Sequence, residues 1–329
     1  MDSELQDWIR QRCRELGFTR VGFTFATDAP GIGHYDAFLS KDHHADMGWM
    51  VTGRDARADP SQLVPGLQSA VVLGIDYGWP RPERPHALTG RVARYAWGRD
   101  YHNLVSKRLR KLCRDLRAKG VGAFWSVDSR PLIERAWAER AGIGFLGKNC
   151  CAIAPGDSSW FFLAAVLVDR ALEPDPPIKG GLERHCGRCT RCHTACPTNA
   201  FVGDGQLDAR RCLSWMTIES RGAIPLAYRE ALGDWVFGCD DCQEVCPHNH
   251  RAPTDLEQDF APRAGHAWLD LPRLLATPDD ALEDSLLGSP LKRPGAVGLK
   301  RNACVALGNI GDTAARPALL GALDHNDPL

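Results

Sequence analysis

Eight cysteines whose spacing suits iron–sulfur chemistry lie between residues 186 and 246. The first run, "CGRCTRCHTACP", has intervals of two, two and three residues and ends in Cys-Pro, which is the spacing of a cluster-binding run. The second run, "CDDCQEVCP", has the same ending but carries Val236 where its first cysteine would stand. Because a cubane cluster usually takes four thiolates, the second run needs a ligand from elsewhere.

Cys212, which lies between the two runs, completes the ligand count. In two-cluster ferredoxins the fourth cysteine of each run binds the cluster of the other run. We therefore predict two 4Fe-4S clusters. The predicted ligands of the first are Cys186, Cys189, Cys192 and Cys246, and those of the second are Cys196, Cys212, Cys239 and Cys242. Zinc also binds Cys-x-x-Cys pairs, but it requires neither the two Cys-Pro endings nor eight crossed ligands.

Strands and helices alternate over residues 1–170. The segments "SAVVLGIDYG" at 69–78 and "WFFLAAVLV" at 160–168 are apolar enough for buried strands, and we expect the second to pair with "CAIAP" at 151–155. Residues 103–120 have leucines at helical spacing and end in glycine, which predicts a helix. This mixture predicts an N-terminal domain of the α+β or α/β class.

Two further domains are predicted after residue 170. Residues 171–255 begin with a linker rich in proline and glycine and contain the cysteine runs, which predicts a ferredoxin-type domain. Residues 256–329 are expected to be all-helical from about residue 268. Their last two helices, separated by "GNIGD", resemble a HEAT-type repeat. One repeat cannot bury its own apolar face, so either the preceding helices cover it or the tail is truncated.

Composition and charge exclude several classes of protein. The formal net charge of the 329 residues is −1, so any RNA contact must come from local basic patches. The N-terminus has no apolar signal core, and the longest apolar run is too short to span a bilayer. Thirteen cysteines without an export signal favour cluster binding in a reducing cytoplasm over a disulfide framework. We expect a cytoplasmic monomer without membrane association.

Several stretches resemble one family, the epoxyqueuosine reductases, which complete the tRNA nucleoside queuosine. They are "ARYAWGRDYH" (93–102), "VDSRPLIERAWAERAGIGFLGKN" (127–149), "LDARRCLSWMTIE" (207–219) and the two cysteine runs. The cysteine runs alone would be shared with many ferredoxins, whereas their combination with the first two stretches is far more specific. The matching stretches cover most of residues 1–250, and a HEAT-like tail is also a feature of the family.

The resemblance implies that the protein binds cobalamin between its N-terminal domain and its two-cluster domain. The sequence lacks an Asp-x-His-x-x-Gly cobalamin motif, which fits a corrinoid with no histidine below the cobalt. By the same resemblance, contacts to the cofactor are expected from Arg57, Asp128, Ser214, Asp240, Lys148 and Asn149. For the last two residues, the tRNA is an alternative ligand.

Asp128 matches the proton donor proposed for the family. It ends a predicted strand just before a helix expected to start at Pro131, a position that opens into a cleft in α/β domains. A general acid there would protonate the departing epoxide oxygen, and desolvation would raise the pKa of its carboxyl. The alternative is that Asp128 or Ser129 only caps the helix. Arg130 and His248 depart from the family pattern, in which a small residue and a tryptophan are usual.

The implied reaction reduces the epoxide of epoxyqueuosine in tRNA to the alkene of queuosine, using two electrons and releasing one water. The clusters would pass electrons singly to the cobalt from a low-potential donor that the sequence does not identify. Two basic surfaces, on the 103–120 helix and in the tail, are candidates for the tRNA. Their predicted RNA-binding residues are Lys107, Arg108, Arg110 and Lys111 on the helix, and Lys292, Arg293, Lys300 and Arg301 in the tail. The simpler alternative for each surface is a solvated face.

Two other functions stay open on the sequence alone. A corrinoid reductase of the dehalogenase type, acting on a small molecule, would need the same cofactors but no RNA surface, and usually has an export signal. A non-catalytic iron–sulfur electron carrier would need neither a large N-terminal domain nor an acid. The basic helix and the helical tail favour the tRNA enzyme over both.

Overall fold

The computed structural model describes residues 3–27, 29–251 and 256–327. Its largest sheet has four strands in the order β1-β2-β7-β4, and every neighbouring pair is antiparallel. The strands are β1 (Arg20–Phe25), β2 (Ser69–Asp76), β7 (Phe161–Val168) and β4 (Ala123–Ser126). The N-terminal region is therefore α+β. The expected pairing of the last apolar strand with residues 151–155 is wrong, because β7 pairs with β2 and β4.

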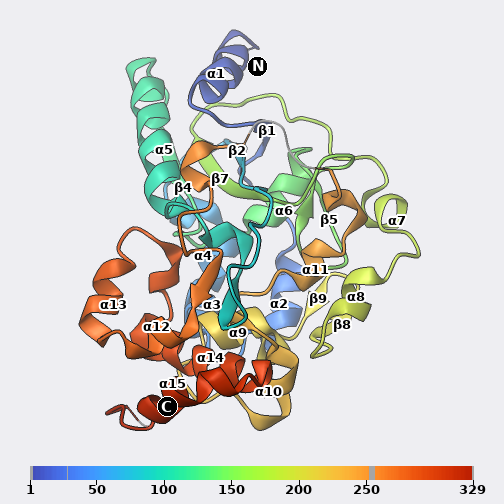
Figure 1. Ribbon diagram of the computed structural model, residues 1–329. Coiled ribbons are helices and arrows are strands. Elements are labelled where there is room, and N and C mark those ends of the chain that lie inside the picture. Colours follow the sequence, from blue (N-terminus) through green and yellow to red (C-terminus); the bar gives the residue numbers. More distant parts are fainter. Residues whose placement is uncertain (1–2, 28, 252–255, 328–329) are drawn as a thin grey trace.

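Helices cover both faces of this sheet (Figure 1). α1 (Ser3–Glu15) and α5 (Tyr101–Ala118) pack on one face, and α6 (Glu134–Arg140) covers the other with Trp137. The side chains of β2 and β7 alternate between these two apolar clusters, and every residue of β2 is buried. A strand covered on both sides must be apolar at nearly every position, which explains the continuous apolar runs in the sequence.

A second sheet joins parts of the chain that are far apart in the sequence. β3 (Thr89–Val92) lies in its centre, with β10 (Trp235–Phe237) parallel and β11 (Trp268–Asp270) antiparallel to it. The expectation that the chain is all-helical from about residue 268 is therefore wrong at its first three residues. The sheet ties the cluster-binding region and the tail to the N-terminal region. The domain boundary predicted at residue 255 lies outside the described residues.

The described part of the tail folds around one long helix. Its helices are α12 (Leu271–Ala276), α13 (Asp279–Ser285), α14 (Gly295–Ile310) and α15 (Arg316–Ala322). Leu299 and Ala303 of α14 belong to the same buried cluster as Trp97 and Val236, which come from the other two regions. The apolar face of α14 is thus covered by earlier parts of the chain as well as by its neighbouring helices.

Short elements connect these layers. The remaining helices are α2 (Ile32–Ser40), α3 (Gly48–Thr52), α4 (Arg54–Ala58), α7 (Gly181–His185), α8 (Arg191–Ala195), α9 (Leu213–Ile218), α10 (Leu226–Leu232) and α11 (Asp241–Glu244). The remaining strands pair as β5 (Phe145–Leu146) with β6 (Ala152–Ile153) and β8 (Phe201–Gly203) with β9 (Gln206–Leu207). None of the described helices is long and apolar enough to cross a membrane.

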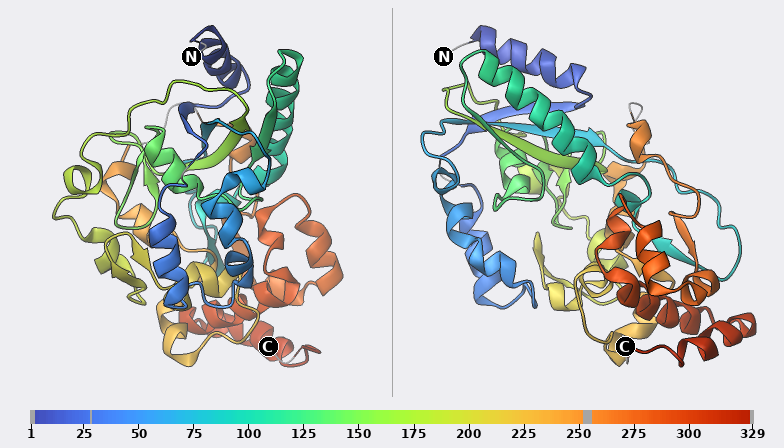
Figure 2. Two further views of the ribbon diagram at one scale, coloured as in Figure 1. Left: turned by 180° about the vertical axis from the view of Figure 1, so that it is seen from behind. Right: turned by 90° about the vertical axis from the view of Figure 1, so that its left-hand side faces the viewer.

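The helices α2 to α4 form an arm that extends from the first sheet toward the second half of the chain (Figure 2). Its connecting loop is tied there by two hydrogen bonds. The indole of Trp215 donates to Asp46 at 3.0 Å, and the backbone N–H of Ala209 donates to the carbonyl of His43 at 2.8 Å. The arm is therefore held at both ends, which fixes the side chains that it carries.

Candidate cluster sites and active site

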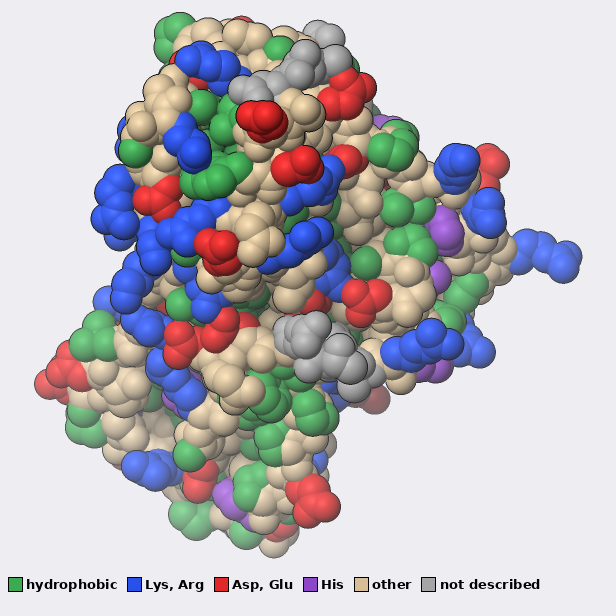
Figure 3. Space-filling model, turned by 90° about the horizontal axis from the view of Figure 1, so that it is seen from above, with side chains coloured by type: hydrophobic (Ala, Val, Ile, Leu, Met, Phe, Trp, Pro, Cys, Tyr) green, Lys and Arg blue, Asp and Glu red, His purple; other side chains and the backbone are tan. Residues whose placement is uncertain are grey.

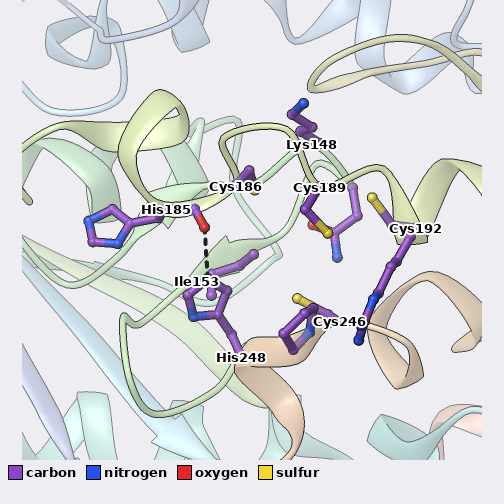
Figure 4. A pocket seen from close by; sticks show the side chains of 11 residues that line it. Lys148, Ile153, His185, Cys186, Cys189, Cys192, Cys246 and His248 are labelled. Atoms are coloured by element: carbon purple, nitrogen blue, oxygen red, sulfur yellow. Dashed lines mark hydrogen bonds between the residues drawn. The ribbon is translucent and has the colours of Figure 1, made fainter.

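The four cysteines predicted for the first cluster surround one cavity (Figure 4). Cys186, Cys189 and Cys192 come from the segment around α7 and α8, and Cys246 faces them from the segment after α11. Burial, together with the nearby thiols of Cys186 and Cys246, raises the pKa of Cys192 to about 11. The donor set of this cavity is therefore four thiols, which fits one 4Fe-4S cluster.

The second predicted set of cysteines also comes together. Burial raises the pKa of Cys212, and the nearby thiol of Cys196 adds to the rise. Partial burial also raises the pKa of Cys239 and that of Cys242, and the thiol of Cys212 raises each pKa further. Within the described residues, no three His, Cys, Asp or Glu side chains converge as ligands of a single metal ion would. The four thiols share one neighbourhood, and their chemistry suits a second 4Fe-4S cluster.

Lys148 and Asn149 lie against the cysteine sets. Both are more than nine-tenths buried and line the first cavity. The ammonium of Lys148 lies 3.1 Å from the carboxylate of Asp204, and the Asn149 amide donates to the carbonyl of Cys242 at 3.3 Å. Their partners are within the protein. Both residues therefore support the cluster-binding loops, and their contact with cobalamin or the tRNA stays a prediction.

Asp128 follows β4 with φ 47°, in the left-handed region that residues other than glycine rarely adopt. Its Oδ2 accepts a hydrogen bond from the Tyr101 hydroxyl at 2.5 Å and lies 3.7 Å from Nε2 of His102. α6 begins only at Glu134, and its N-cap residue, Ile133, makes no capping bond through its side chain. The alternative that Asp128 only caps this helix is therefore wrong.

The first turn of α5 holds the two partners of Asp128. Asp100 is the N-cap residue, and one carboxylate oxygen bonds both the backbone N–H and Nδ1 of His102 at 2.9 Å. The Tyr101 ring stacks on Phe162 of β7 at 4.2 Å and on the His102 ring at 4.0 Å. Helix capping and aromatic stacking together fix the positions of the tyrosine hydroxyl and the imidazole.

The charges at this site differ from the prediction. Although 67% of the Asp128 side chain is exposed, the surrounding protein raises its pKa by burial. The ion pair with His102 and the hydrogen bond from Tyr101 outweigh this effect and lower the pKa overall. Burial lowers the pKa of His102, but bonds with Asp100 and Asp128 raise it to about 9. Asp128 is therefore a carboxylate at neutral pH, and the proton is on His102. The expected raised pKa of Asp128 is wrong.

Two buried polar atoms near Asp128 have no hydrogen-bond partner within the described structure, Nη1 of Arg57 and Oε1 of Glu134. Arg57 is buried, and its guanidinium lies over the rings of Tyr35 and Trp49 in the arm. Burial and the negative charge of Asp128 raise the pKa of Glu134 to about 8. Unpaired polar atoms of this kind need a partner. The primary amides around a corrin ring supply both donors and acceptors, so these residues fit cobalamin.

Asp240 lies in the interior. Its side chain is 4% exposed, accepts a hydrogen bond from the backbone N–H of Arg94 at 2.7 Å and lies 3.5 Å from the guanidinium of Arg81. Burial raises its pKa to about 6. This carboxylate joins the segment after β3 to the second cluster-binding loop. Asp240 is therefore a structural anchor in this region, and its contact with cobalamin stays a prediction.

Tyr95 lies near both the Asp128 site and the second cysteine set. Burial and the nearby charges of Asp128 and Asp240 raise the pKa of Tyr95 well above its usual value. Asp240 follows Cys239 directly in the sequence, so the charged neighbours of Tyr95 include the acid and a residue next to one predicted ligand of the second cluster. Ser214, on α9, is half-buried and stays a predicted cofactor contact.

The predicted RNA-binding side chains of α5 divide into two kinds. Lys107, Arg110 and Lys111 are exposed, although the guanidinium of Arg110 lies over the ring of Trp125 at 5.4 Å. Arg108 is largely buried and forms an ion pair with Glu257. The exposed cations can reach a phosphate, whereas Arg108 already has a carboxylate partner.

In the tail, two of the four predicted RNA-binding residues are buried. Lys300 pairs with Asp279 at 2.6 Å, and Arg301 donates to the carbonyls of Ser220, Gly222 and Met216. Both are structural cations, so their assignment to an RNA surface is corrected.

The other two predicted tail residues are exposed. Arg293 pairs with Glu219 at 2.9 Å, and its positive charge helps to lower the pKa of Asp128. The tail therefore brings one cation toward the Asp128 site, while Lys292 is the second exposed cation at this end of α14.

Sequence reasoning missed Tyr101, His102 and Glu134. A signal was present for the first two, because Asp100 is an N-cap type directly before the predicted helix and therefore places the next residues in its first turn. Nothing in the local pattern indicates that this turn meets Asp128, because the contact arises only when α5 packs against β4 in the folded chain.

Two sets of four thiols beside an acid with two proton-bearing neighbours define an iron–sulfur oxidoreductase. The family model "4Fe-4S double cluster binding domain" matches residues 185–249, and the model "Epoxyqueuosine reductase QueG, DUF1730" matches residues 57–129. The first match covers all eight predicted cluster ligands, and the second extends from Arg57 to just beyond Asp128.

The relatives are similar over nearly the whole chain. The epoxyqueuosine reductase of Xanthomonas campestris pv. campestris is 40% identical over 97% of this chain and 91% of its own. A crystal structure of epoxyqueuosine reductase with a tRNA-Tyr epoxyqueuosine-modified stem loop has a TM-score of 0.88 and 31% identity, covering 99% of this chain and 87% of the other. The Bacillus subtilis enzyme, solved with an aspartate-bearing catalytic loop swung out of the active site, has a TM-score of 0.87 and 30% identity over the same shares. The chain belongs to the epoxyqueuosine reductase family.

Proposed function

We propose that this protein reduces the epoxide of epoxyqueuosine in tRNA to the alkene of queuosine, with cobalamin and two 4Fe-4S clusters. The reaction consumes two electrons and two protons and releases one water. Family membership supplies the substrate class. The observation that carries the chemistry is the group formed by Asp128, the Tyr101 hydroxyl that donates to it and the His102 imidazole that pairs with it, with Tyr95 and the second cysteine set nearby. The protein acts as a cytoplasmic monomer that draws on a low-potential electron donor.

The electrons pass through the two predicted cysteine sets in order. The first set lies in a segment whose neighbouring residues Arg188 and Arg191 are exposed, whereas the second set neighbours Asp240 and Tyr95. Electrons therefore enter at the first cluster and leave from the second. When bound, cobalamin would supply a reduced metal centre with the reactivity needed to open the epoxide.

Residues of the arm and of α6 would hold the cofactor. Nη1 of Arg57 and Oε1 of Glu134 are the polar atoms that its peripheral amides would satisfy. Trp49, whose side chain is half exposed and lies beside the Arg57 guanidinium, gives the arm an apolar surface next to these atoms. Ser214, on α9, stays a proposed contact with the cofactor.

Asp128 delivers the proton that the departing oxygen needs. Because its own pKa is lowered, it takes this proton from protonated His102 and passes it on, and the partly exposed imidazole is recharged from solvent. Tyr101 keeps its proton, because burial raises its pKa well above the usual value, and its hydroxyl orients the carboxylate. The left-handed conformation of Asp128 fits a loop that moves, as the related Bacillus subtilis structure describes for that enzyme.

The tRNA approaches over exposed cations on α5 and the tail. Lys107 and Lys111 lie about 9 and 15 Å along the helix from Tyr101, at a rise of about 1.5 Å per residue. Arg293 and Lys292 offer further cations on the tail side. A stem loop that contacts both can present its modified base to Asp128, since chemistry on a base requires it to leave the stack.

The proposal is tested by turnover with the whole chain. The anaerobically reconstituted protein should convert an epoxyqueuosine-containing stem loop to the queuosine form when cobalamin and a chemical reductant are supplied, as measured by nucleoside mass spectrometry. Omitting cobalamin should abolish conversion. A fully loaded protein that leaves the epoxide intact would overturn the proposal. Dehalogenation of a halogenated phenol instead would favour the small-molecule alternative.

A further inference from the structure

A basic surface around the first cysteine set is not used by the function described above. Between residues 179 and 191 the chain carries four cations and one carboxylate. These are Lys179, Arg184, Arg188 and Arg191, with Glu183 as the carboxylate. All five residues are exposed, and within the described part of the chain none of the four cations has an ion-pair or hydrogen-bond partner. We refer to this segment as the 179–191 surface.

The 179–191 surface lies over the first predicted cluster. It contains α7 and two of the four cysteines of the first set, Cys186 and Cys189. Arg191 directly precedes a third, Cys192, and lines the same cavity as these cysteines. In Figure 3, Lys, Arg and His side chains gather on the right-hand side, where α7 lies in Figure 1. A partner that binds here is therefore close to the first cluster.

Most of the other Lys and Arg side chains in the described part of the chain already contact a carboxylate, a carbonyl or an aromatic ring. Arg108 pairs with Glu257 and Lys300 with Asp279, while the Lys119 ammonium lies over the ring of Trp8 at 4.6 Å. Against this background, four neighbouring cations without partners are a distinct feature. Such a group creates a positive potential that attracts a partner of opposite charge.

We propose that the 179–191 surface is the docking site of an acidic, low-potential electron-carrier protein. The inference rests on the proposed reductase function, which needs two electrons for each epoxide. Electron transfer between proteins requires close redox centres, so the carrier must dock over the accessible cluster. Complexes of this kind have small interfaces, and opposite charges speed their formation. In each encounter the reduced carrier loses one electron and the first cluster gains it, so two encounters supply one turnover.

RNA phosphates would also be attracted to these cations, but the observations favour the protein partner. The modified base must reach Asp128, which neighbours Tyr95 and the second cysteine set. The 179–191 surface instead belongs to the first set. Cations beside the first cluster can bind an electron donor directly. The exposed cations of α5 lie on the helix that carries Tyr101, so they are the ones placed to bind RNA near Asp128.

The test compares two triple variants with the same change of net charge. The first is Lys179→Glu/Arg184→Glu/Arg188→Glu, which spares Arg191 because that residue lines the cluster cavity. The control is Arg14→Glu/Arg273→Glu/Arg316→Glu, whose exposed side chains lie on α1, α12 and α15. A reduced acidic flavodoxin is the probe, and stopped-flow absorbance follows reduction of the oxidised clusters without tRNA.

We expect the first variant to be reduced at least about tenfold more slowly than wild type at low ionic strength, because electrostatic steering typically changes association rates by about 10- to 1,000-fold. The difference should shrink as salt is added, and the control should change less than about twofold. Equal rates for both variants, or an unchanged salt dependence, would overturn the proposal.

Two further measurements keep the result interpretable. Dithionite should bleach the clusters of all proteins to the same extent, which shows that they are loaded. If the triple variant loses clusters, Arg184→Gln/Arg188→Gln should still show an intermediate slowing.

The triple variant should bind the stem loop as tightly as wild type. Weakened RNA binding together with normal reduction by flavodoxin would assign the surface to RNA instead. Because no epoxide is present in the kinetic assay, these outcomes are independent of the reductase activity.

Discussion

The cluster-binding region and the Asp128 site are assembled in different ways. Seven of the eight predicted cluster ligands come from two short runs, so the backbone between them sets their spacing. The Asp128 site instead combines the first turn of α5, the end of β4 and the start of α6, with Arg57 from the arm and Arg293 from the tail. Local spacing can therefore predict the first region, whereas only tertiary packing creates the second.

The two regions also differ in how their charges are satisfied. In the cluster region burial raises the pKa of thiols in both sets, so that they are neutral without metal. Metal binding must displace those protons, and it then contributes to the stability of the fold. At the Asp128 site, by contrast, the protein supplies a counter-charge through His102 and a hydrogen bond through Tyr101. The first region should therefore depend on its cofactor, and the second should keep its arrangement without one.

Loss of a single cluster ligand should give the largest effect. Cys212→Ala removes the one ligand of the second set that lies outside the two runs, so iron should fall from about eight to about four atoms per chain. Turnover should be abolished because the electron path is interrupted. Iron analysis and electron spin resonance measure the change. Cys304→Ala, on α14, is the control and should keep both clusters; an unchanged spectrum in Cys212→Ala would show that our ligand partition is wrong.

The same contrast explains what the sequence could and could not predict. The cysteine sets and the buried strands β2 and β7 follow from spacing and apolar runs, which are local properties. The pairing of β7, the strand β11 and the burial of Lys300 and Arg301 depend on which distant segment packs against each residue. A lysine or arginine in a helix has the same local pattern whether it faces solvent or a row of backbone carbonyls.

The charge state of Asp128 could not be predicted for the same reason. Burial alone would raise the pKa of a carboxyl, as the sequence argument assumed. The pKa of Asp128 is instead lowered, because His102 and Tyr101 contact its carboxylate, and this contact is not visible in the sequence. The resemblance to the family nevertheless predicts Asp128 as the proton donor, because a family pattern depends on which residue stands at a position and not on what surrounds it in space.

Removing the acid should have the next largest effect. In Asp128→Asn the amide can still accept the Tyr101 hydrogen bond but cannot deliver a proton, and loss of general acid catalysis typically costs about 100- to 10,000-fold in rate. Turnover of the stem loop measures this loss, while iron content, cobalamin content and melting temperature should stay near wild type. Ser129→Ala, at the exposed neighbouring position, should be nearly normal. Near-normal turnover of Asp128→Asn would exclude it as the acid, and loss of cobalamin would reassign it to cofactor binding.

Substitutions on α5 should have a smaller effect. Lys107→Ala/Lys111→Ala removes two exposed cations, whereas Arg108 is left in place because Glu257 already neutralises it. If both cations contact phosphates, the slope of log affinity against log salt should fall by about 1.5, since each contact contributes roughly 0.7 to 0.9. Fluorescence titration of the stem loop at several salt concentrations measures the slope. An unchanged slope would make this helix face a solvated surface.

The smallest expected effect concerns the pH dependence of stability. The pKa of His102 in the folded protein is about 9, above its ordinary value of about 6.5. A raised pKa means that the folded state binds the proton more tightly, so the resulting stabilisation is fully present below about pH 6.5 and is lost as the pH rises through about 9. The melting temperature of wild type should therefore exceed that of His102→Gln at pH 6, and the gap should close by about pH 9.5.

This last measurement decides whether the protein groups around Asp128 hold the proton on His102 without help from the cofactor. His34→Gln, at an exposed position on α2, is the control and should leave the pH dependence of the melting temperature unchanged. The gap between wild type and His102→Gln should be present in protein without cobalamin, because Asp100 and Asp128 are the partners that hold the proton. A gap that arises only after cobalamin is added would show that the cofactor organises this site. The contrast with the cysteine sets, which require their metal, would then disappear.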